Sequence, residues 1–368
     1  MPAPLVRADC REPPEMVPAN DWHTRRRRMI LRAHPEIRKL TSLPAEFYFW
    51  LMSALLLLHL GVGTTIAVYA QTGIAWFWTI VLAATIGAFL IFALQQLTHE
   101  LCHVKRNRRQ MMPALLADFA VGSTGPAYAA YYFIFHMPHH AKTGNEDDPD
   151  LKYHAEWADP PRWLARSRLT RFLWITLFGL FTIEILFLEH KLGVVPRPWF
   201  SIRNKRLVLL LLGKYGFMAL TFWLGGFWCF LYFRLAAGFS VGAFAHPYLG
   251  FWLMQHAATA RNGYQPTVSY SGSRIWHWLN LGELYHLEHH DFPWVPFTKI
   301  EAVRRIAPEY YRSCHVVTSV WRLTWDWLSH TDGSPWSDVA GVLVYPVSAW
   351  KDGLRRRPAP PVTMPVEA

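Results

Sequence analysis

The chain has 368 residues, a formal net charge of +11 and a mean hydropathy of +0.08, which is high for a soluble protein. Aromatic residues make up 15% of the chain, and such rings are enriched at membrane interfaces. The basic residues flank apolar segments, which favours the cytoplasmic face of a membrane protein over a nucleic-acid-binding surface. The four cysteines are scattered without a Cys-x-x-Cys pair, which argues against a disulfide framework.

The N-terminal segment, residues 1–45, is polar and rich in Pro and Arg. No apolar stretch typical of a signal sequence occurs before residue 46, so we expect membrane insertion to use internal segments. A short amphipathic stretch begins at Arg25, and we expect it to lie in solvent or on the membrane surface.

Four mainly apolar segments have a length that suits a membrane helix, which needs about 20 residues. They are residues 46–70, 74–97, 207–232 and 233–255. Residues 22–39 and 105–109 are strongly basic, whereas the 71–73 link has no Lys or Arg. The first two helices should therefore form a hairpin with both ends in the cytoplasm. The other two should form a second hairpin that turns around Arg234.

The remaining segments complete the predicted organisation. Residues 112–135 and 172–188 are broken or short, and we expect them to be re-entrant or interfacial parts of a membrane domain at 46–256. We expect a cytoplasmic cap at 257–353 and a disordered tail at 354–368. The predicted fold is an all-α integral membrane protein with four transmembrane helices in two hairpins and a cytoplasmic helical cap.

Eight of the 18 histidines fall in three short groups at the cytoplasmic level of this topology. The groups are His99 with His103, His136 with His139 and His140, and His286 with His289 and His290. Histidines four apart share one face of a helix, and adjacent histidines point in different directions. These imidazoles are too many for one tetrahedral ion, so the spacing predicts a site for two metal ions.

A ninth histidine, His256, lies alone between the last two groups and ends the fourth apolar segment. We expect it to complete the ligand set of one metal ion. The deeper His246 should instead pack between helices or hydrogen-bond to a ligand. Carboxylates near the groups are candidates to receive hydrogen bonds from the ligands. They are Glu100, Glu146, Asp147, Asp148, Asp150, Glu283, Glu288 and Asp291.

The ligand type alone does not fix the metal, because imidazole suits zinc, copper, iron and nickel. Iron would supply the activated oxygen needed to break an aliphatic C–H bond of a membrane lipid. Zinc would instead indicate a membrane hydrolase. A metal-sensing receptor or transporter is the non-enzymatic alternative, but it does not explain nine converging histidines.

The three histidine groups resemble the three-box pattern of the membrane fatty-acid desaturase and hydroxylase superfamily. The chain is most similar to its sphingolipid Δ4-desaturase branch, over roughly residues 22–330. The similarity is carried by RRRRMILRAHPEIRKL at 25–40, HLEHHDFPWVP at 286–296, RRIAPEYY at 304–311 and His246-Pro247.

This resemblance implies two Fe ions, O2 as co-substrate and electrons from an external cytochrome b5 or ferredoxin-type carrier. It implies a double bond at the 4,5 position of a dihydroceramide-type sphingoid base. A sphingolipid C4-hydroxylase and an acyl-lipid or acyl-CoA desaturase remain alternatives. We expect a multi-pass protein with a cytoplasmic active site, in a bacterial inner membrane or the endoplasmic reticulum of a eukaryote, and no nucleic-acid partner.

Overall fold

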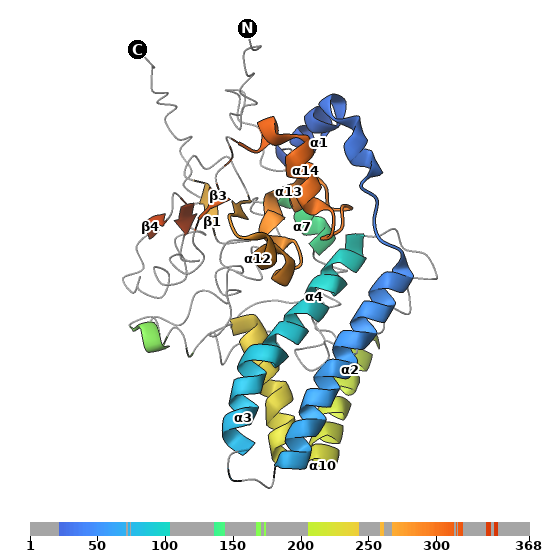
Figure 1. Cartoon of the computed structure of the whole chain (residues 1–368), viewed down its shortest axis with the longest axis vertical. Helices are drawn as coiled ribbons and strands as arrows, with labels where there is room; N and C mark the ends of the chain where they lie inside the picture. Colours follow the sequence, from blue (N-terminus) through green and yellow to red (C-terminus); the bar gives the residue numbers. More distant parts are fainter. Residues whose placement is uncertain are drawn as a thin grey trace.

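Long helices form a bundle at one end of the molecule, and short elements form a cap at the other (Figure 1). The computed structural model describes residues 22–70, 73, 75–103, 136–143, 167–170, 173, 205–242, 258–260, 267–312, 314, 316–318, 336–339 and 342–344. The helices of the bundle are α2 (Ala45–Tyr69), α3 (Ala75–Leu82), η3 (Ala83–Gly87), α4 (Ala88–His103) and α10 (Lys205–Gly242). The helices outside it are α1 (Trp22–Ala33), η2 (Pro35–Lys39), α7 (Met137–Lys142), α12 (Arg274–Leu279), η6 (Glu283–Tyr285), α13 (His286–Asp291), α14 (Ile300–Ile306) and η7 (Pro308–Tyr310).

The first two apolar segments form the helices expected of them. Helix α2 begins and ends within one residue of the prediction. Elements α3, η3 and α4 follow one another without a break, so this helical run continues past residue 97 to include His99 and His103. The π-helical turn η3 packs against α10, where Gly87 leaves room for the neighbouring helix.

The third apolar segment reverses direction at Gly226, which has non-helical angles (φ 70°, ψ −173°) inside α10. The Phe217 and Phe233 ring centroids are 5.2 Å apart. A straight helix would separate residues 16 positions apart by about 24 Å. The predicted turn around Arg234 is therefore wrong: this side chain lies in the returning arm, buried. The Gly225-Gly226 pair permits the reversal, because glycine adopts positive φ without a steric cost.

By length and composition, three helical stretches among the described residues could cross a membrane: Ala45–Tyr69, Ala75–His103 and Leu212–Ser240, the last of which contains the reversal at Gly226. Their outer faces carry large apolar side chains, such as Trp50 at 70% and Trp223 at 83% exposure. Water would disfavour so much exposed apolar surface, whereas lipid tails accept it. The described bundle is that of a membrane protein.

The N-terminal helix α1 belongs to the cap, in contrast to the expected solvated or membrane-surface helix. Its Trp22 and Ile30 are buried in a core with Leu287, Phe292 and Val303. The buried face of α1 also includes His23 and Arg26. The sequence suggested a surface helix because charged residues dominate α1, but two of its polar side chains face protein.

The cap also contains short strands, so the expectation of an all-α fold is wrong in this region. Strands β1 (Ala258–Ala260), β5 (Val342–Val344) and β4 (Trp336–Val339) form an antiparallel sheet in that order. Strands β2 (Ser269–Tyr270) and β3 (Val316–Val317) pair in parallel. Strands of two to four residues have too little alternation for the sequence pattern to show them.

Several expectations fall on residues outside the described part of the chain. They concern the segments 104–135, 174–188, 243–257 and 345–368, which include His246 and His256. Cys102 and Cys229 are free and buried in helices, as small apolar residues would be, whereas Cys314 is disulfide-bonded.

Candidate metal centre

The last turns of α4 carry the first histidine group to the junction between bundle and cap. His99 and His103 share one face of this helix, with ring centroids 5.2 Å apart. His99 Nδ1 lies 3.3 Å from Gln96 Oε1 and 3.6 Å from a Glu283 carboxylate oxygen. Because both neighbours are acceptors, Nδ1 carries the proton and Nε2 presents its lone pair toward the other histidines.

The second group lies on α7 and meets the first. His136 Nε2 lies 2.6 Å from His99 Nε2, and His140 Nε2 lies 2.8 Å from His136 Nε2. His103 Nε2 is 3.4 Å from His99 Nε2. Two nitrogens that each lie about 2.1 Å from one ion are about 3.0 Å apart when they subtend a right angle. The spacing of these nitrogens is therefore that of ligands around one cation.

The third group, on α13, adds His289 to this set. Its ring centroid lies 4.6 Å from that of His99 and 4.9 Å from those of His103 and His140. His289 Nε2 is buried and has no hydrogen-bond partner, which is costly for a polar atom unless a cation binds it. One ligand atom from each of five histidines lies within 4.8 Å of the others. This five-histidine cluster consists of His99, His103, His136, His140 and His289.

A second set, the three-histidine group, consists of His139, His286 and His290. His286 Nε2 and His290 Nε2 are 3.1 Å apart, and the rings of His139 and His290 are 4.9 Å apart. The ring of His290 also stacks on that of His140 at 4.2 Å, so the two sets adjoin. The sequence prediction that neighbouring histidines point to different places agrees with this division.

Hydrogen bonds fix the tautomers of His286 and His290. The Thr143 hydroxyl donates to the His139 carbonyl at 2.7 Å, so its oxygen accepts from His290 Nδ1 at 3.2 Å. His286 Nδ1 donates to Glu283 at 3.3 Å. Both Nε2 atoms therefore present lone pairs to each other across 3.1 Å. Two facing lone pairs repel unless a cation lies between them, so these residues fit a metal ion.

Burial favours the neutral form of several histidines of the site. Burial, followed by the proximity of other histidines, lowers the pKa of His136, His140, His289 and His290 well below the ordinary value. The pKa of His286 is also lowered by burial, although the hydrogen bond to Glu283 opposes the shift. Neutral imidazole is the form that binds a metal.

Of the four candidate carboxylates that the structure describes, Glu283 is the one in contact with histidines of two groups, His99 and His286. Burial alone would raise the pKa of Glu283, but the two histidines hold it well below its usual range. The other three described carboxylates fix helices instead. Glu100 accepts from Tyr48 Oη at 2.9 Å, and Glu288 accepts from Ser269 Oγ at 2.7 Å.

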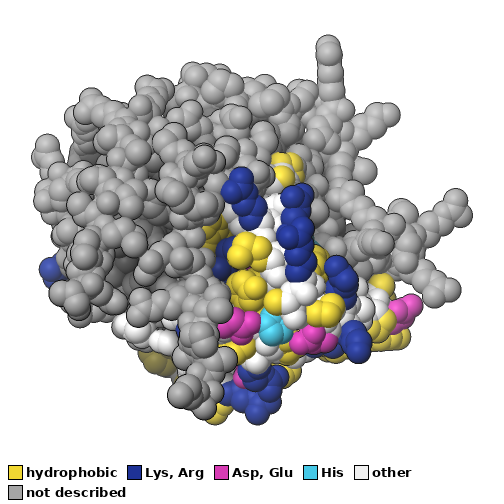
Figure 2. Space-filling view, turned by 90° about the horizontal axis from the view of Figure 1, so that it is seen from above, with side chains coloured by type: hydrophobic (Ala, Val, Ile, Leu, Met, Phe, Trp, Pro, Cys, Tyr) yellow, Lys and Arg dark blue, Asp and Glu magenta, His cyan; other side chains and the backbone are white. Residues whose placement is uncertain are grey.

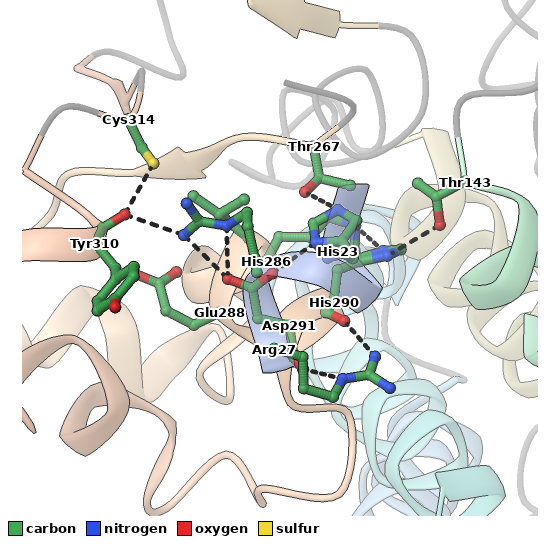
Figure 3. Close-up of polar contacts among 12 residues, drawn as sticks. His23, Arg27, Thr143, Thr267, His286, Glu288, His290, Asp291, Tyr310 and Cys314 are labelled. Carbon is green, nitrogen blue, oxygen red and sulfur yellow. Dashed lines mark hydrogen bonds and ion pairs between the residues drawn. The ribbon is translucent and has the colours of Figure 1, made fainter. Parts of the chain in front are cut away.

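Asp291 ties α13 to the N-terminal helix. Its carboxylate accepts from His23 Nδ1 at 2.8 Å, Arg26 Nε at 3.1 Å and Tyr311 Oη at 3.0 Å. Figure 3 shows this network between α1 and the third histidine group. His23 belongs to none of the three histidine groups of the sequence. Its only signal was its place beside the Arg-rich segment, because its partner lies 268 positions further along the chain.

The structure thus brings eight of the nine predicted ligands into two adjoining sets. The ninth, His256, and its competitor His246 lie outside the described residues. The acidic run 146–150 also lies outside them.

Comparison with known proteins agrees with this arrangement. A family model described as fatty acid desaturase matches residues 75–321, which is more than half of the chain. The chain belongs to the fatty acid desaturase family. A second model, described as sphingolipid Delta4-desaturase, matches residues 17–43, which include α1 and η2. The protein is therefore an oxidoreductase, as the histidine pattern indicated.

Individual relatives extend the similarity to about nine-tenths of the chain. A sphingolipid delta(4)-desaturase of Xenopus tropicalis is 28% identical over 331 residues, covering 89% of this chain and 94% of that protein. A sphingolipid delta(4)-desaturase of Drosophila melanogaster is 27% identical over 328 residues, with 88% and 94% coverage. A sphingolipid delta(4)-desaturase/C4-monooxygenase of Homo sapiens is 29% identical over 349 residues, with 92% and 97% coverage.

Proposed function

We propose that the protein is an O2-dependent di-iron lipid desaturase that acts on a saturated sphingoid base. The facing Nε2 atoms of His286 and His290, beside the five-histidine cluster, carry the proposal, because they leave lone pairs for two cations. The relatives' names support a double bond at the 4,5 position of a dihydroceramide-type substrate.

In this proposal the five-histidine cluster holds one ion, and the three-histidine group with His256 holds the other. Bound iron supplies the oxygen activation that aliphatic C–H cleavage demands. The protein's part is to hold neutral imidazoles with fixed tautomers, which Glu283 and Thr143 do by accepting hydrogen bonds from their Nδ1–H groups. Burial excludes bulk water from the reacting centre.

The electron balance requires an external donor. Desaturation removes two protons and two electrons from the lipid, and the other two electrons of the broken C–H bonds become the double bond. Two further electrons from a carrier and two protons from water complete the reduction of O2 to two waters. We propose that a small acidic carrier of the cytochrome b5 or ferredoxin type docks on the cap. Lys and Arg side chains gather on this end of the molecule (Figure 2). Arg25, Arg28 and Arg32 are exposed on one side of α1.

The position of the bundle explains how a lipid can reach the histidine site. We propose that α2, the α3–α4 run and the two arms of α10 make four crossings in two hairpins, with the cap in the cytoplasm. The site lies where α4 leaves the bundle, so a lipid chain reaches it from the bilayer. The host membrane is then a bacterial inner membrane or the endoplasmic reticulum.

The test supplies membranes that contain the protein with a saturated dihydroceramide and a saturated acyl-CoA in parallel, together with a carrier and its reductase. We expect mass spectrometry to show an unsaturated sphingoid base that is made only with O2. The His289→Ala variant, which lacks a ligand of the five-histidine cluster, should form none. Conversion of the acyl-CoA alone would contradict the sphingolipid assignment, and conversion without O2 would contradict oxidative chemistry.

A C4-hydroxylase is the second candidate, because the human relative's name includes C4-monooxygenase. The two reactions differ in the fate of oxygen: hydroxylation leaves one O2 oxygen atom in the lipid, whereas desaturation leaves none. Turnover under 18O2 separates them, since only a hydroxylated product gains the label. Stoichiometric zinc without iron in active protein would contradict the di-iron assignment.

A further inference from the structure

The N-terminal helix α1 is joined to the last residues of α13, the helix that carries the third histidine group. Their shared residue is Asp291, whose side chain is fully buried. Three donors surround this carboxylate: His23, Arg26 and Tyr311. A buried carboxylate is stable only when charged or hydrogen-bonded partners replace its water, and α1 provides two of the three.

A second set of contacts holds the backbone of α13. Arg27 Nε donates to the Asp291 carbonyl at 2.5 Å, and an Arg27 terminal nitrogen donates to the His290 carbonyl at 3.1 Å. The last carbonyls of a helix have no partner within it, and α13 has only six residues. Arg27 therefore caps the helix at the residues that follow His289, and its charge suits the negative end of the helix dipole.

The third contact reaches the His290 ring itself. The rings of His23 and His290 are 5.0 Å apart. His23 Nδ1 donates to Asp291, so its Nε2 accepts from the Thr267 hydroxyl at 3.1 Å. Both nitrogens of His23 thus form hydrogen bonds within the protein, which excludes His23 as a metal ligand. Its ring instead packs beside the ring of His290.

We propose that His23, Arg26 and Arg27 form a strap that positions His290 and so sets the affinity of the three-histidine group for its metal. The inference rests on the proposed di-iron function. The strap contacts α13 and its C-terminal end, whereas four members of the five-histidine cluster come from α4 and α7. Loss of the strap should therefore release the metal of the three-histidine group first.

The experiment measures iron per folded chain after purification in detergent from iron-replete cells, for His23→Gln, Arg26→Ala, Arg26→Lys and Arg27→Ala. We expect about two iron atoms in the native protein and about one in His23→Gln, Arg26→Ala and Arg27→Ala. Arg26→Lys, which keeps the charge beside Asp291, should recover part of the loss. Arg28→Ala is the matched control, because Arg28 is exposed on the same helix.

Each outcome has a separate meaning. Native protein without two iron atoms would contradict the proposed function. Two iron atoms in both the native protein and the folded strap variants would overturn the strap, whatever their activity. Loss of both iron atoms together would overturn the selectivity for the three-histidine group. If Arg26→Ala, which leaves a buried carboxylate short of its cation, fails to fold, His23→Gln and Arg27→Ala decide.

Discussion

At the scale of single residues, the site depends on which ring nitrogen carries the proton. Glu283 and Thr143 each accept a hydrogen bond from an Nδ1–H, and so Nε2 of His286 and of His290 presents its lone pair inward. Sequence spacing predicted that these histidines come together because box histidines recur at three and four residues. It identified Glu283 only as one of several candidate carboxylates. It did not identify Thr143, because a single hydroxyl residue forms no recurring motif in the sequence.

The first prediction concerns Glu283. Glu283→Gln keeps the size of the side chain but removes the negative charge that two histidines share. We expect metal affinity to fall roughly 10- to 100-fold, the usual effect of losing a partner behind a ligand. Chelator competition for Fe2+ measures it. Glu301→Gln on α14 is the control, since that side chain is 40% exposed. Equal affinities in both variants would show that Glu283 does not support the metal.

At the scale of elements, contacts between helices explain where sequence prediction succeeded and where it failed. The ends of α2 followed from a single apolar segment bounded by polar residues. The turn within α10 was predicted at Arg234 because a charged residue interrupts the apolar segment there. The chain instead reverses at the Gly225-Gly226 pair. Arg234 is buried against the other arm, where its guanidinium lies 3.9 Å from Met218 Sδ.

A second prediction tests this packing. A Cβ added at Gly87 would lie 2.8 Å from Ala236 Cβ and 3.0 Å from the Tyr232 ring. Gly87→Ala should therefore separate η3 from α10 and cost about 1–3 kcal/mol, the usual cost of overpacking. Gly61→Ala, with open space at its Cβ, should be neutral or stabilising by up to about 1 kcal/mol through helix propensity. Thermal unfolding in detergent compares them, and equal midpoints would contradict the close contact.

At the scale of the whole molecule, the described residues form one apolar end and one basic end. The bundle exposes apolar side chains, while the cap presents the basic side chains of α1 to the solvent. The net charge of +11 predicted a basic cytoplasmic face. It did not predict that the basic helix α1 would lie in the cap, away from the bundle (Figure 1). That placement depends on Asp291, which no local pattern connects to α1.

A third prediction follows for carrier docking. Replacing Arg25, Arg28 and Arg32 together by Glu should raise the KM for an acidic carrier about tenfold or more at low salt, with kcat little changed. The difference from the native protein should shrink as salt screens the charges. Arg274→Glu, exposed on α12, is the control. Turnover measured against carrier concentration at two ionic strengths tests it, and an unchanged KM would exclude this face as the docking surface.

The contact between His23 and Asp291 spans 268 positions, and this separation affects biosynthesis. A ribosome adds about 5 to 20 residues per second, so roughly 13 to 54 s pass between the synthesis of the two partners. All the described helices of the bundle are made within that interval. The three-histidine group can therefore reach its final geometry only after residue 291 has been made, and a chain that stops between residues 242 and 286 would contain the helices of the bundle but none of the histidines of α13.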